Sequence, residues 1–558
     1  MANYNITTNP ASVYPPAAGA PADIVAHAND HGPINGFVEL FDTTMATPAT
    51  GNVPVWNGTG WAPAVPASAS GTATGWLNVK AAPYNAAGDG TTNDAGAIQA
   101  ALTAANTAGG GVVFLPPGTY IINRYLLIYS NTYLRGSGMG VTTIKCGSGF
   151  TAGGTAPLGG GYSMLQTNAA SGMVNVAVSD LTFDGNESVN RATLSGAGNR
   201  VSSYLVDMRG VTGLAVDRVA TRNTWTYNIV VFNCSRFRVT QCDVQSVNTS
   251  GVYNQMDGIH ILGSNQGRIV GNHVDNGIGS DADDGLVAHV IAGGQPCYDL
   301  VYANNVVRGG ANGDGIQVAG DAVLIRDITI IGNVFWGCRR GIFTNFYAAS
   351  GNQPIRGLSI VGNTLRDGTL YEPIFIHLYA DGKWEDVTIA DNIIDGYGSA
   401  AQPSTFAISV EGGNGSRGIS ITGNTMRNGW SRAIFLSEGA PLVQDYVIAN
   451  NIIDMQAASA SPLAVILGSS KDGIFSGNVL TGRGTADGVG VYVDSTVAAQ
   501  ATNQIIHANR VRAFNTGIQV TNGAGNNPTN TIVTSNITQG CTTGLSFGTA
   551  TVTSANNL

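Results

Sequence analysis

Three aspartates recur in the middle of the chain, each directly before a glycine and an aliphatic residue. Asp257 stands in MDGIHI, Asp284 in DDGLVA and Asp314 in GDGIQV, at spacings of 27 and 30 residues. If each interval is one turn of a repeating fold, the three carboxyl groups lie one above another, about 5 Å apart. Carboxylates that close repel one another, which raises the pKa of at least one of them. Cleavage of a glycosidic bond uses such a pair of carboxyl groups, one as acid and one as base or nucleophile.

A fourth aspartate, Asp283, directly precedes Asp284 in GSDADDGL and completes the set of predicted catalytic residues. In the same register the next two turns carry Arg340 in RGIFTN and Glu372 in EPIFIH, at further spacings of 26 and 32 residues. The sequence leaves the roles of acid, base and nucleophile open. A stacked row offers both the closer carboxyl spacing of a retaining glycosidase and the wider spacing of an inverting one.

Side chains that suit carbohydrate lie beside this row. Strand alternation puts every second residue on the solvent face, so aromatic, amide, carboxylate and imidazole side chains are expected to share one long exposed surface. Sugar rings stack on aromatic faces while polar side chains bond hydroxyl groups, and a polymer fits such a surface. The alternative is that the exposed aromatic residues bury a subunit interface. The predicted substrate-binding residues are His260, His289, Gln317, Arg340, Phe343, Glu372, Phe375 and His377.

Two other interpretations of these residues remain open. The first is a polysaccharide lyase, in which Ca²⁺ held by oxygen ligands from Asp281, Asp283 and Asp284 acidifies a proton beside a uronate, and Arg340 removes or orients that proton. Hydrolysis needs no cofactor, and it is favoured because the pKa of arginine exceeds about 12, which makes arginine a rare base. The second is that Asp-Gly is turn chemistry in which glycine supplies a positive φ, as we expect for Asp487 in TADGVG.

A recurring phrase of alternating apolar residues that ends in Gly-Asn, or a close variant, indicates the element that positions these side chains. It occurs as RIVGNHV, LSIVGNTL and QIIHANRV among others, with a period of about 29 residues. Alternation indicates strands, and a period of this length indicates stacked units. No crossover helix separates the strands, so they are predicted to wind as a parallel β-helix whose asparagines form an amide ladder. The ladder asparagines are Asn272, Asn305, Asn333, Asn363, Asn392, Asn424, Asn451, Asn478, Asn509 and Asn536.

The two ends of the chain differ from this repeat. Solenoids need caps, and TTNDAGAIQAALTAANTAGGG predicts one amphipathic helix that begins at Asn93 or Asp94 and buries Ile98 and Leu102. VPVWNGTGWAP predicts a hairpin or turn, followed by a linker. We therefore expect an N-terminal segment over residues 1–75 and a β-helix domain over residues 76–558, which either continues to the end or gives way to a C-terminal tip from about residue 525.

Composition excludes several classes of function. Charged residues make up 11% of the 558 residues and the net charge is −9, with no basic stripe, so nucleic acid is an unsuitable partner. No apolar run approaches the roughly 18 residues of a membrane span, so membrane insertion is not expected. The six cysteines lack paired metal spacing and are expected to be reduced core thiols. The first residues show neither the basic nor the apolar region of a secretory signal.

Residues 82–138 contain the motifs GDGTTND, GGGVVFLPPGTY and YLRGSG. Through them the chain resembles the pectate lyase-like superfamily of single-stranded right-handed parallel β-helices, which includes polysaccharide lyases, glycoside hydrolases and the tailspikes and minor tail proteins of bacteriophages. The resemblance implies an all-β, right-handed solenoid. MDGI and SDADDGL also resemble the paired aspartates of the polygalacturonase-like hydrolases, although the Gly-His-Gly and Arg-Ile-Lys motifs of those enzymes are absent.

The first 75 residues resemble, through VWNGTGWAP, the attachment segments that precede such a β-helix in phage tail proteins. The resemblance implies a homotrimeric virion protein, made in the host cytoplasm, which binds other phage tail proteins through residues 1–75. We therefore predict a tailspike or minor tail protein that binds and hydrolyses a host cell-surface polysaccharide. The alternatives are a non-catalytic receptor-binding or structural tail fibre, a polysaccharide lyase, and a free carbohydrate-active enzyme of a bacterium.

Overall fold

The chain divides into two compact units, Met1–Trp76 and Leu77–Leu558. In the first unit, β1 (Val53–Trp56) and β2 (Trp61–Ala64) form the expected antiparallel hairpin, with Trp56 opposite Trp61. The computed structural model describes residues 53–56, 61–64, 76–150, 163–194, 204–224, 227–246, 257–276, 283–291, 294–309, 313–321, 324–348, 355–367, 371–377, 383–399, 402, 405–411, 415–436, 443–456, 462–468, 470–484, 487–495, 501–521, 527–548 and 550–558.

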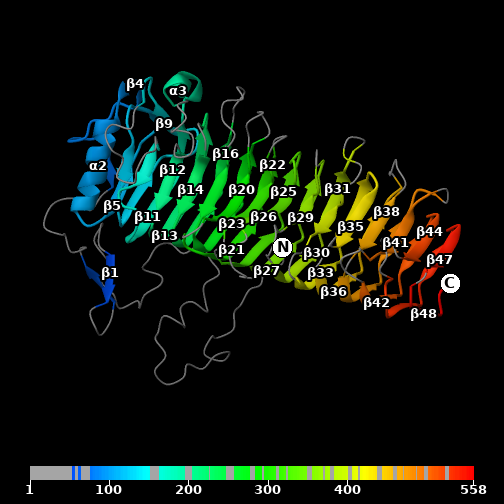
Figure 1. The fold of residues 1–558 in the computed structure, drawn as a ribbon. Coiled ribbons are helices and arrows are strands. Elements are labelled where there is room, and N and C mark those ends of the chain that lie inside the picture. The colour runs from blue at the N-terminus through cyan, green and yellow to red at the C-terminus, as the bar shows by residue number, and fades with distance from the viewer. Residues whose placement is uncertain are drawn as a thin grey trace, which may run out of the picture. The chain divides into compact units, whose positions relative to one another are not determined.

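The second unit is a parallel β-helix, so the predicted fold class is confirmed (Figure 1). One wall is a 15-stranded sheet in which each strand pairs in parallel with the equivalent strand of the next coil. Its strands are β7 (Leu126–Ile128), β10 (Leu165–Thr167), β12 (Tyr204–Arg209), β14 (Tyr227–Phe232), β17 (Ile259–Leu262), β20 (Leu286–Val290), β23 (Ile316–Asp321), β26 (Ile342–Ala348), β29 (Ile374–Ile376), β32 (Ile408–Val410), β35 (Arg432–Leu436), β38 (Leu463–Leu467), β41 (Val489–Val493), β44 (Thr516–Val520) and β47 (Thr543–Phe547).

The remaining strands of the coils form the other walls, on either side of the asparagine turn. The strands before that turn are β3 (Leu77–Asn78), β5 (Gly111–Phe114), β8 (Thr132–Arg135), β15 (Ser235–Thr240), β18 (Asn265–Val270), β21 (Cys297–Ala303), β24 (Ile325–Ile331), β27 (Ile355–Val361), β30 (Trp384–Ala390), β33 (Arg417–Thr422), β36 (Val443–Ala449), β39 (Ser470–Ser476), β42 (Thr502–His507), β45 (Thr531–Thr534) and β48 (Val552–Ala555). Those after it are β4 (Asp89–Asn93), β6 (Gly118–Ile122), β9 (Thr142–Cys146), β16 (Asp243–Gln245), β19 (His273–Asp275), β22 (Val306–Arg308), β25 (Val334–Trp336), β28 (Thr364–Arg366), β31 (Ile393–Tyr397), β34 (Thr425–Gly429), β37 (Ile452–Asp454), β40 (Val479–Thr481), β43 (Arg510–Arg512) and β46 (Ile537–Gln539).

Two coils that lack the ladder asparagine have a single long strand in place of two short ones. These strands are β11 (Met173–Asp184) and β13 (Val211–Arg222). Strand β13 pairs with both β15 and β16 of the next coil, and therefore spans both walls. At the other end of the chain, β45, β46 and β47 pair in parallel with β42, β43 and β44, so the residues after 525 continue the solenoid.

The asparagine ladder has the structural role that the repeat predicts. All ten asparagines are buried; each of the first nine bonds the next one along the solenoid, and Asn536 bonds Asn557. Asn392, for example, donates from Nδ2 to Asn424 Oδ1 at 2.9 Å and to the Ile360 carbonyl at 2.9 Å, while its Oδ1 accepts the Asn363 amide at 2.9 Å. Buried polar groups need hydrogen-bond partners. The ladder asparagines supply these partners to the backbone groups that the tight turn leaves unpaired.

The residue before each ladder asparagine explains why the phrase ends in Gly-Asn or a close variant. Gly332 and Gly362 have φ of +66° and +64°, a left-handed conformation that glycine adopts without steric cost. Asn304 and Asp391 take the same conformation at +54° and +56° in other coils. Asparagine and aspartate are the side chains that tolerate this region best, and only Ala508 and Ser535, before the last two ladder asparagines, depart from these residue types.

A helix caps the first coils. The predicted helix is α2 (Ala95–Thr107), which begins after Asp94, packs on β5, β7 and β8, and buries Ile98 and Leu102 completely. Asp94 does not cap the helix with its side chain; its carboxylate instead accepts the amides of Ala87 at 2.6 Å and Gly88 at 2.9 Å. A second helix, α3 (Glu187–Leu194), follows β11. Among the described residues, neither helix has the length and hydropathy of a membrane span.

Candidate active site

The aspartate row lies at the start of neighbouring strands of the 15-stranded sheet. Ile259 of β17 pairs with Leu286 of β20, and Leu286 with Ile316 of β23, which sets Asp257, Asp284 and Asp314 in one register two residues earlier. The amide of Gly258 donates to the Asp284 carbonyl at 2.9 Å, and the amide of Gly285 to the Asp314 carbonyl at 2.8 Å. The three aspartates therefore occupy successive coils, as their spacing predicts.

The glycine after each aspartate is required by close packing between coils. A Cβ at Gly258 would lie 2.4 Å from the Gly285 carbonyl oxygen, and a Cβ at Gly315 would lie 2.5 Å from the Gly341 carbonyl oxygen. None of these glycines has a left-handed φ, so the interpretation of the row as positive-φ turn chemistry is wrong. That interpretation does fit Asp487, because Gly488 after it has a φ of +87°.

One oxygen of each stacked aspartate holds the next coil. Asp257 Oδ1 accepts the Asp284 amide at 3.2 Å, and Asp284 Oδ1 accepts the Asp314 amide at 2.9 Å. Asp314 Oδ1 accepts Arg340 Nε at 2.8 Å. The three stacked aspartates are 2–4% exposed. These three carboxyl groups therefore contribute to coil registry, which limits the oxygen atoms left for a ligand.

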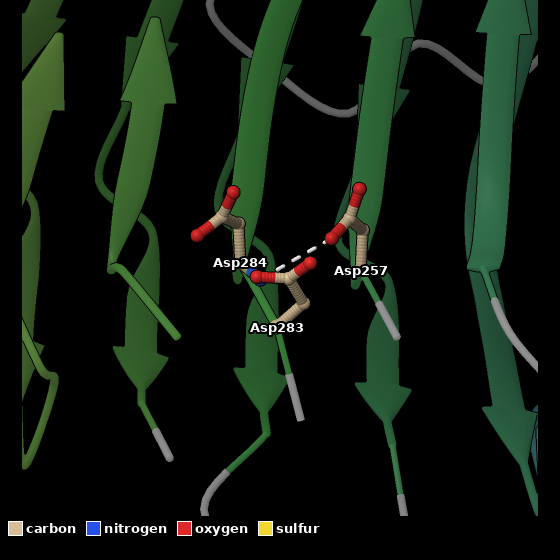
Figure 2. A group of neighbouring side chains, drawn as sticks. All are labelled: Asp257, Asp283 and Asp284. Atoms are coloured by element: carbon tan, nitrogen blue, oxygen red, sulfur yellow. Dashed lines mark hydrogen bonds between the residues drawn. The ribbon is translucent and has the colours of Figure 1, made fainter. Parts of the chain in front are cut away.

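Asp283 differs from the stacked aspartates because it is only half-buried. Figure 2 shows its carboxyl group lying between those of Asp257 and Asp284, and one oxygen from each of the three lies within 4.8 Å of the others. Burial raises the pKa of Asp283 to about 8, and the nearby negative charges of Asp257 and Asp314 add to the rise. A carboxyl group that remains protonated at neutral pH and can be reached from outside is the form that a general acid requires.

Asp257 is paired with a histidine in the interior of the site. His260 Nδ1 lies 2.5 Å from Asp257 Oδ2, and His260 is 5% exposed. Burial raises the pKa of Asp257 to about 7 and lowers that of His260 to about 4. Both shifts favour the neutral forms, so we assign one proton to the contact between the carboxyl oxygen and the imidazole nitrogen.

Two arginines border the cluster on its downstream side. Burial raises the pKa of Asp284, and the charges of Asp283 and Asp314 raise it further. Burial also raises the pKa of Asp314, although the guanidinium of Arg340 opposes that rise. Arg340 lies 3.3 Å over the Phe343 ring, and Arg339 lies 4.9 Å over the Tyr371 ring. The carboxyl cluster is thus bounded by cations held on aromatic faces.

The predicted substrate-binding residues share one face in the expected register, but several of them are not exposed. His260 pairs along the row with Val287, Gln317, Phe343 and Phe375. His260 is 5% exposed and Phe343 3% exposed, so the prediction of solvent exposure is wrong for both. Side chains stacked at the strand spacing cover one another, and Arg340 covers the Phe343 ring. Half-buried positions of the set are His289, Gln317, Arg340, Glu372, Phe375 and His377.

The downstream part of the face includes a hydrogen-bonded histidine. His377 Nδ1 lies 2.8 Å from Glu411 Oε2, and the His377 ring lies 5.0 Å from that of Phe375. Burial raises the pKa of Glu372, and the charge of Glu411 adds to that rise. These side chains provide a mixture of ring faces and hydroxyl-bonding groups, which suits a sugar.

The structure extends the aspartate row upstream through two tyrosines. Tyr227 is one of the aromatic residues that the sequence offers as an extension of this surface, and Tyr204 is the one that sequence reasoning missed. Tyr227 continues the aspartate row one coil earlier, and Tyr204 two coils earlier. The rings of Tyr204 and Tyr227 are 5.3 Å apart, and those of Tyr227 and His260 are 4.9 Å apart. The coils that carry Tyr204 and Tyr227 lack the Asp-Gly phrase by which the row was traced. Counting back from MDGIHI by the register of the aliphatic residues would have found Tyr204 too.

The proposed calcium ligands are only partly described. Asp281 lies outside the described residues. The group with oxygens within 4.8 Å of one another is Asp257, Asp283 and Asp284. Three carboxyl groups are the kind of ligand that Ca²⁺ prefers, so this donor set fits a hard cation, although one oxygen each of Asp257 and Asp284 also accepts a backbone amide.

Comparison with known proteins finds sequence similarity between part of the chain and polysaccharide-modifying enzymes. Residues 76–186 match the family model described as "Rhamnogalacturonase A/epimerase, pectate lyase-like", which confirms the pectate lyase-like resemblance. Mannuronan C5-epimerase AlgE1 of Azotobacter vinelandii is 30% identical over 271 residues, which are 43% of this chain and 18% of that protein. The chain thus spans less than a fifth of the length of this relative.

Two phage proteins are also similar. The pre-neck appendage protein of Bacillus phage B103 is 29% identical over 153 residues, which are 27% of this chain and 16% of that protein. The tailspike protein of E. coli bacteriophage HK620 superposes with a TM-score of 0.53 at 12% identity, covering 85% of this chain and 78% of the tailspike. At that identity the superposition shows a shared fold.

Proposed function

We propose that this protein is a phage tailspike or minor tail protein whose β-helix binds a host surface polysaccharide and hydrolyses it at the aspartate cluster. The observation that carries the proposal is Asp283, a half-buried carboxyl group with a pKa of about 8 beside buried carboxyl groups on the same face. Carboxyl groups with strongly shifted pKa values cluster at catalytic sites.

In this proposal Asp283 is the general acid that protonates the leaving oxygen of the glycosidic bond. The second carboxyl group comes from the stacked row, where Asp257 and Asp284 are nearest. One oxygen of each of these carboxyl groups lies within 4.8 Å of the others, which is compatible with the carboxyl spacing of about 5 to 5.5 Å in retaining enzymes. The half-buried side chains Gln317, Phe375 and His377 would position sugar units along the face.

The similarity to phage proteins supports the biological setting of the proposal. A tailspike shares the fold, and a phage appendage protein is related in sequence over part of the chain. We propose a virion location, a homotrimeric assembly, and attachment to other tail proteins through residues 1–75. The polysaccharide-modifying relative over 43% of the chain supports a carbohydrate-active site.

The test is to incubate the purified protein with capsular, cell-wall and mannuronan polysaccharides and to follow two signals. Reducing ends without absorbance near 235 nm indicate hydrolysis, and reducing ends with that absorbance indicate elimination. Tight binding of a polymer with neither signal would exclude hydrolysis and elimination. If the sugar composition of the polymer is also unchanged, that result would identify a receptor-binding or structural tail fibre.

The acid is tested with Asp283→Asn, which keeps the size of the side chain and removes its proton donor. We expect cleavage to fall by about 10²-fold to 10⁴-fold, the usual contribution of general acid catalysis. Binding of the polymer and the melting temperature should change little. Asp487→Asn is the matched control, because Asp487 also precedes a glycine but forms an exposed ion pair with Arg483. Equal cleavage by Asp283→Asn and the control would remove Asp283 from the mechanism.

A calcium-dependent lyase is the second candidate, because Asp257, Asp283 and Asp284 bring three oxygen ligands together. Bound calcium would acidify the proton beside a uronate, and these aspartates would hold the ion. Loss of cleavage on chelation, restored by added calcium and accompanied by absorbance near 235 nm, would favour the lyase over the hydrolase.

A further inference from the structure

An arginine upstream of the carboxyl cluster is held in the manner of Arg340. Arg209 of β12 donates from Nε to Asp207 Oδ1 at 2.7 Å, and Asp207 is 1% exposed. The guanidinium lies 5.9 Å from the centre of the Tyr204 ring and 5.5 Å from that of the Phe232 ring. The Asp207 carboxylate also accepts Ser163 Oγ at 3.2 Å. The ion pair and the rings fix the orientation of the guanidinium.

This arrangement leaves hydrogen-bond donors without acceptors. The Nη groups of Arg209 make no hydrogen bond or ion pair with a described residue. Gln166 of β10 lies directly beside Asp207 in the sheet register, and it is 2% exposed. Its Nε2 has no hydrogen-bond partner in the described part of the chain. Buried polar groups are normally satisfied, so this buried amide donor, next to the aspartate that anchors Arg209, points to a ligand that supplies acceptor oxygens.

The upstream residues lie on the same face as the carboxyl cluster. In the 15-stranded sheet, β12 is followed by β14, β17, β20, β23 and β26. Five strand steps separate the coil of Arg209 from that of Arg340, which corresponds to about 24 Å along the solenoid. The rings of Tyr204, Tyr227, His260 and His289 connect the two regions, with centroid separations of 5.3, 4.9 and 5.5 Å.

We propose that Arg209, Gln166 and the Tyr204 ring form a subsite for an acidic sugar unit, in the same polysaccharide chain that reaches the carboxyl cluster. This inference rests on the proposed function. The Nη groups of Arg209 and Nε2 of Gln166 are donors, and a carboxylate or phosphate group offers only acceptors. A chain bound at Arg209 and at the cluster together must contain several units, so short oligosaccharides lack this contact.

The test is calorimetric binding in the Asp283→Asn background, which prevents turnover of the probe. The carboxylate probes are oligomannuronates from disaccharide to octasaccharide, and the phosphate probe is poly(glycerol phosphate) of matched length. We expect the long form of one anionic probe to bind and Arg209→Lys to weaken it by about 10-fold to 100-fold, as for lost hydrogen bonds to a charged group. The disaccharide should be unaffected by the substitution. Preference for one probe identifies the acidic group.

Controls separate this subsite from general effects. Arg238→Gln removes an arginine that is paired with Asp217 on another wall, and it should leave binding unchanged. The double variant Asp207→Asn with Arg209→Gln removes both charges, avoids a buried unpaired carboxylate, and should lose the same long-chain affinity with its melting temperature preserved.

Several results would overturn the inference. These are failure of both anionic probes to bind, equal binding of dextran oligosaccharides, or an equal loss for short and long chains. If the wild-type protein cleaves a polymer normally and substitution of Arg209 does not change the binding of that polymer, the subsite is contradicted and the proposed function stands. Length-dependent binding through Arg209 without cleavage by the wild-type protein would contradict the hydrolase and leave the subsite standing.

Discussion

Burial sets the acid–base behaviour of the individual aspartates more than their mutual repulsion does. For Asp257, Asp283 and Asp284, removal from water is the largest cause of the raised pKa. Repulsion within the stacked row was expected to raise the pKa of at least one carboxyl group. The shift extends to the whole cluster because each carboxyl group lies under a neighbouring coil, where the charged form loses hydration.

The raised pKa values predict how stability depends on pH. In the folded state the pKa is about 7 for Asp257 and about 8 for Asp283. Both groups therefore remain protonated at pH values well above about 3.9, the pKa of an aspartate in the unfolded chain. Below about pH 4 the contribution of each group to stability is fully present, and it is lost as the pH rises through the folded pKa. We expect Asp283 to make the free energy of unfolding fall with increasing pH by about 1.4 kcal/mol per pH unit. The equal slope from Asp257 is offset below about pH 6.5 by His260, because a histidine whose pKa is lowered to about 4 makes stability rise with pH.

Urea denaturation at pH values between 5 and 8 measures this slope, and Asp283→Asn should reduce it because the amide does not titrate. A melting temperature that rises steadily over the same range would contradict the raised pKa values. The activity of a protonated acid should likewise decline as the pH rises through about 8.

At the scale of the strand and turn, the fold depends on close contact between coils. The Asp-Gly-aliphatic phrase has three structural parts. The aspartate accepts the amide of the next coil, the glycine permits the backbone approach, and the aliphatic residue fills the core. The same phrase therefore serves both the scaffold and the candidate site.

Substitution of a glycine in this row should be costly. A Cβ at Gly285 would lie 2.4 Å from Val307 Cγ1 and 2.9 Å from the Gly315 carbonyl oxygen. We expect Gly285→Ala to lower the free energy of unfolding by about 3 kcal/mol, as in an overpacked core. Cleavage should fall too, because Asp284 is the preceding residue.

The control for that substitution is Gly96→Ala in α2, where the nearest atom to a new Cβ is Arg124 Nη2 at 4.0 Å. Alanine should stabilise this helical position by about 0.5 to 1 kcal/mol. Similar melting temperatures for Gly285→Ala and the wild type would show that the coils separate readily at this row.

For the whole molecule, the expected homotrimer remains a prediction. Four aliphatic side chains on successive strands β36, β39, β42 and β45 form an exposed stripe on the C-terminal coils. Each is 36–39% exposed, and stripes of this kind occur at contacts between subunits. They are Val447, Ile474, Ile505 and Ile532.

Light scattering after gel filtration measures the assembly. We expect a mass of three times the 57.3 kDa of the chain, and we expect Ile474→Asp together with Ile505→Asp to yield monomers if the stripe is the interface. A wild-type mass of 57.3 kDa would contradict the trimer.

Much of the architecture could be predicted from the sequence because the chain is built from a repeat. A side chain that returns every 27 to 33 residues must occupy one position of each coil, so the asparagine ladder from Asn272 to Asn536 and the row of Asp257, Asp284 and Asp314 followed from spacing. The helix at 95–107 followed from its apolar periodicity and its glycine-rich end. These features are local or periodic, and local pattern determines them.

Only the tertiary structure decided which of these side chains a ligand can reach. His260 and Phe343 occupy predicted outward positions but are buried, and Asp283 is the half-buried aspartate beside fully buried ones. Gln166, Asp207 and Arg209 belong to coils without the recurring phrase, so no spacing connected them to the site. Exposure and pKa depend on what packs over a side chain from neighbouring coils, and periodicity along the chain carries no information about that covering layer.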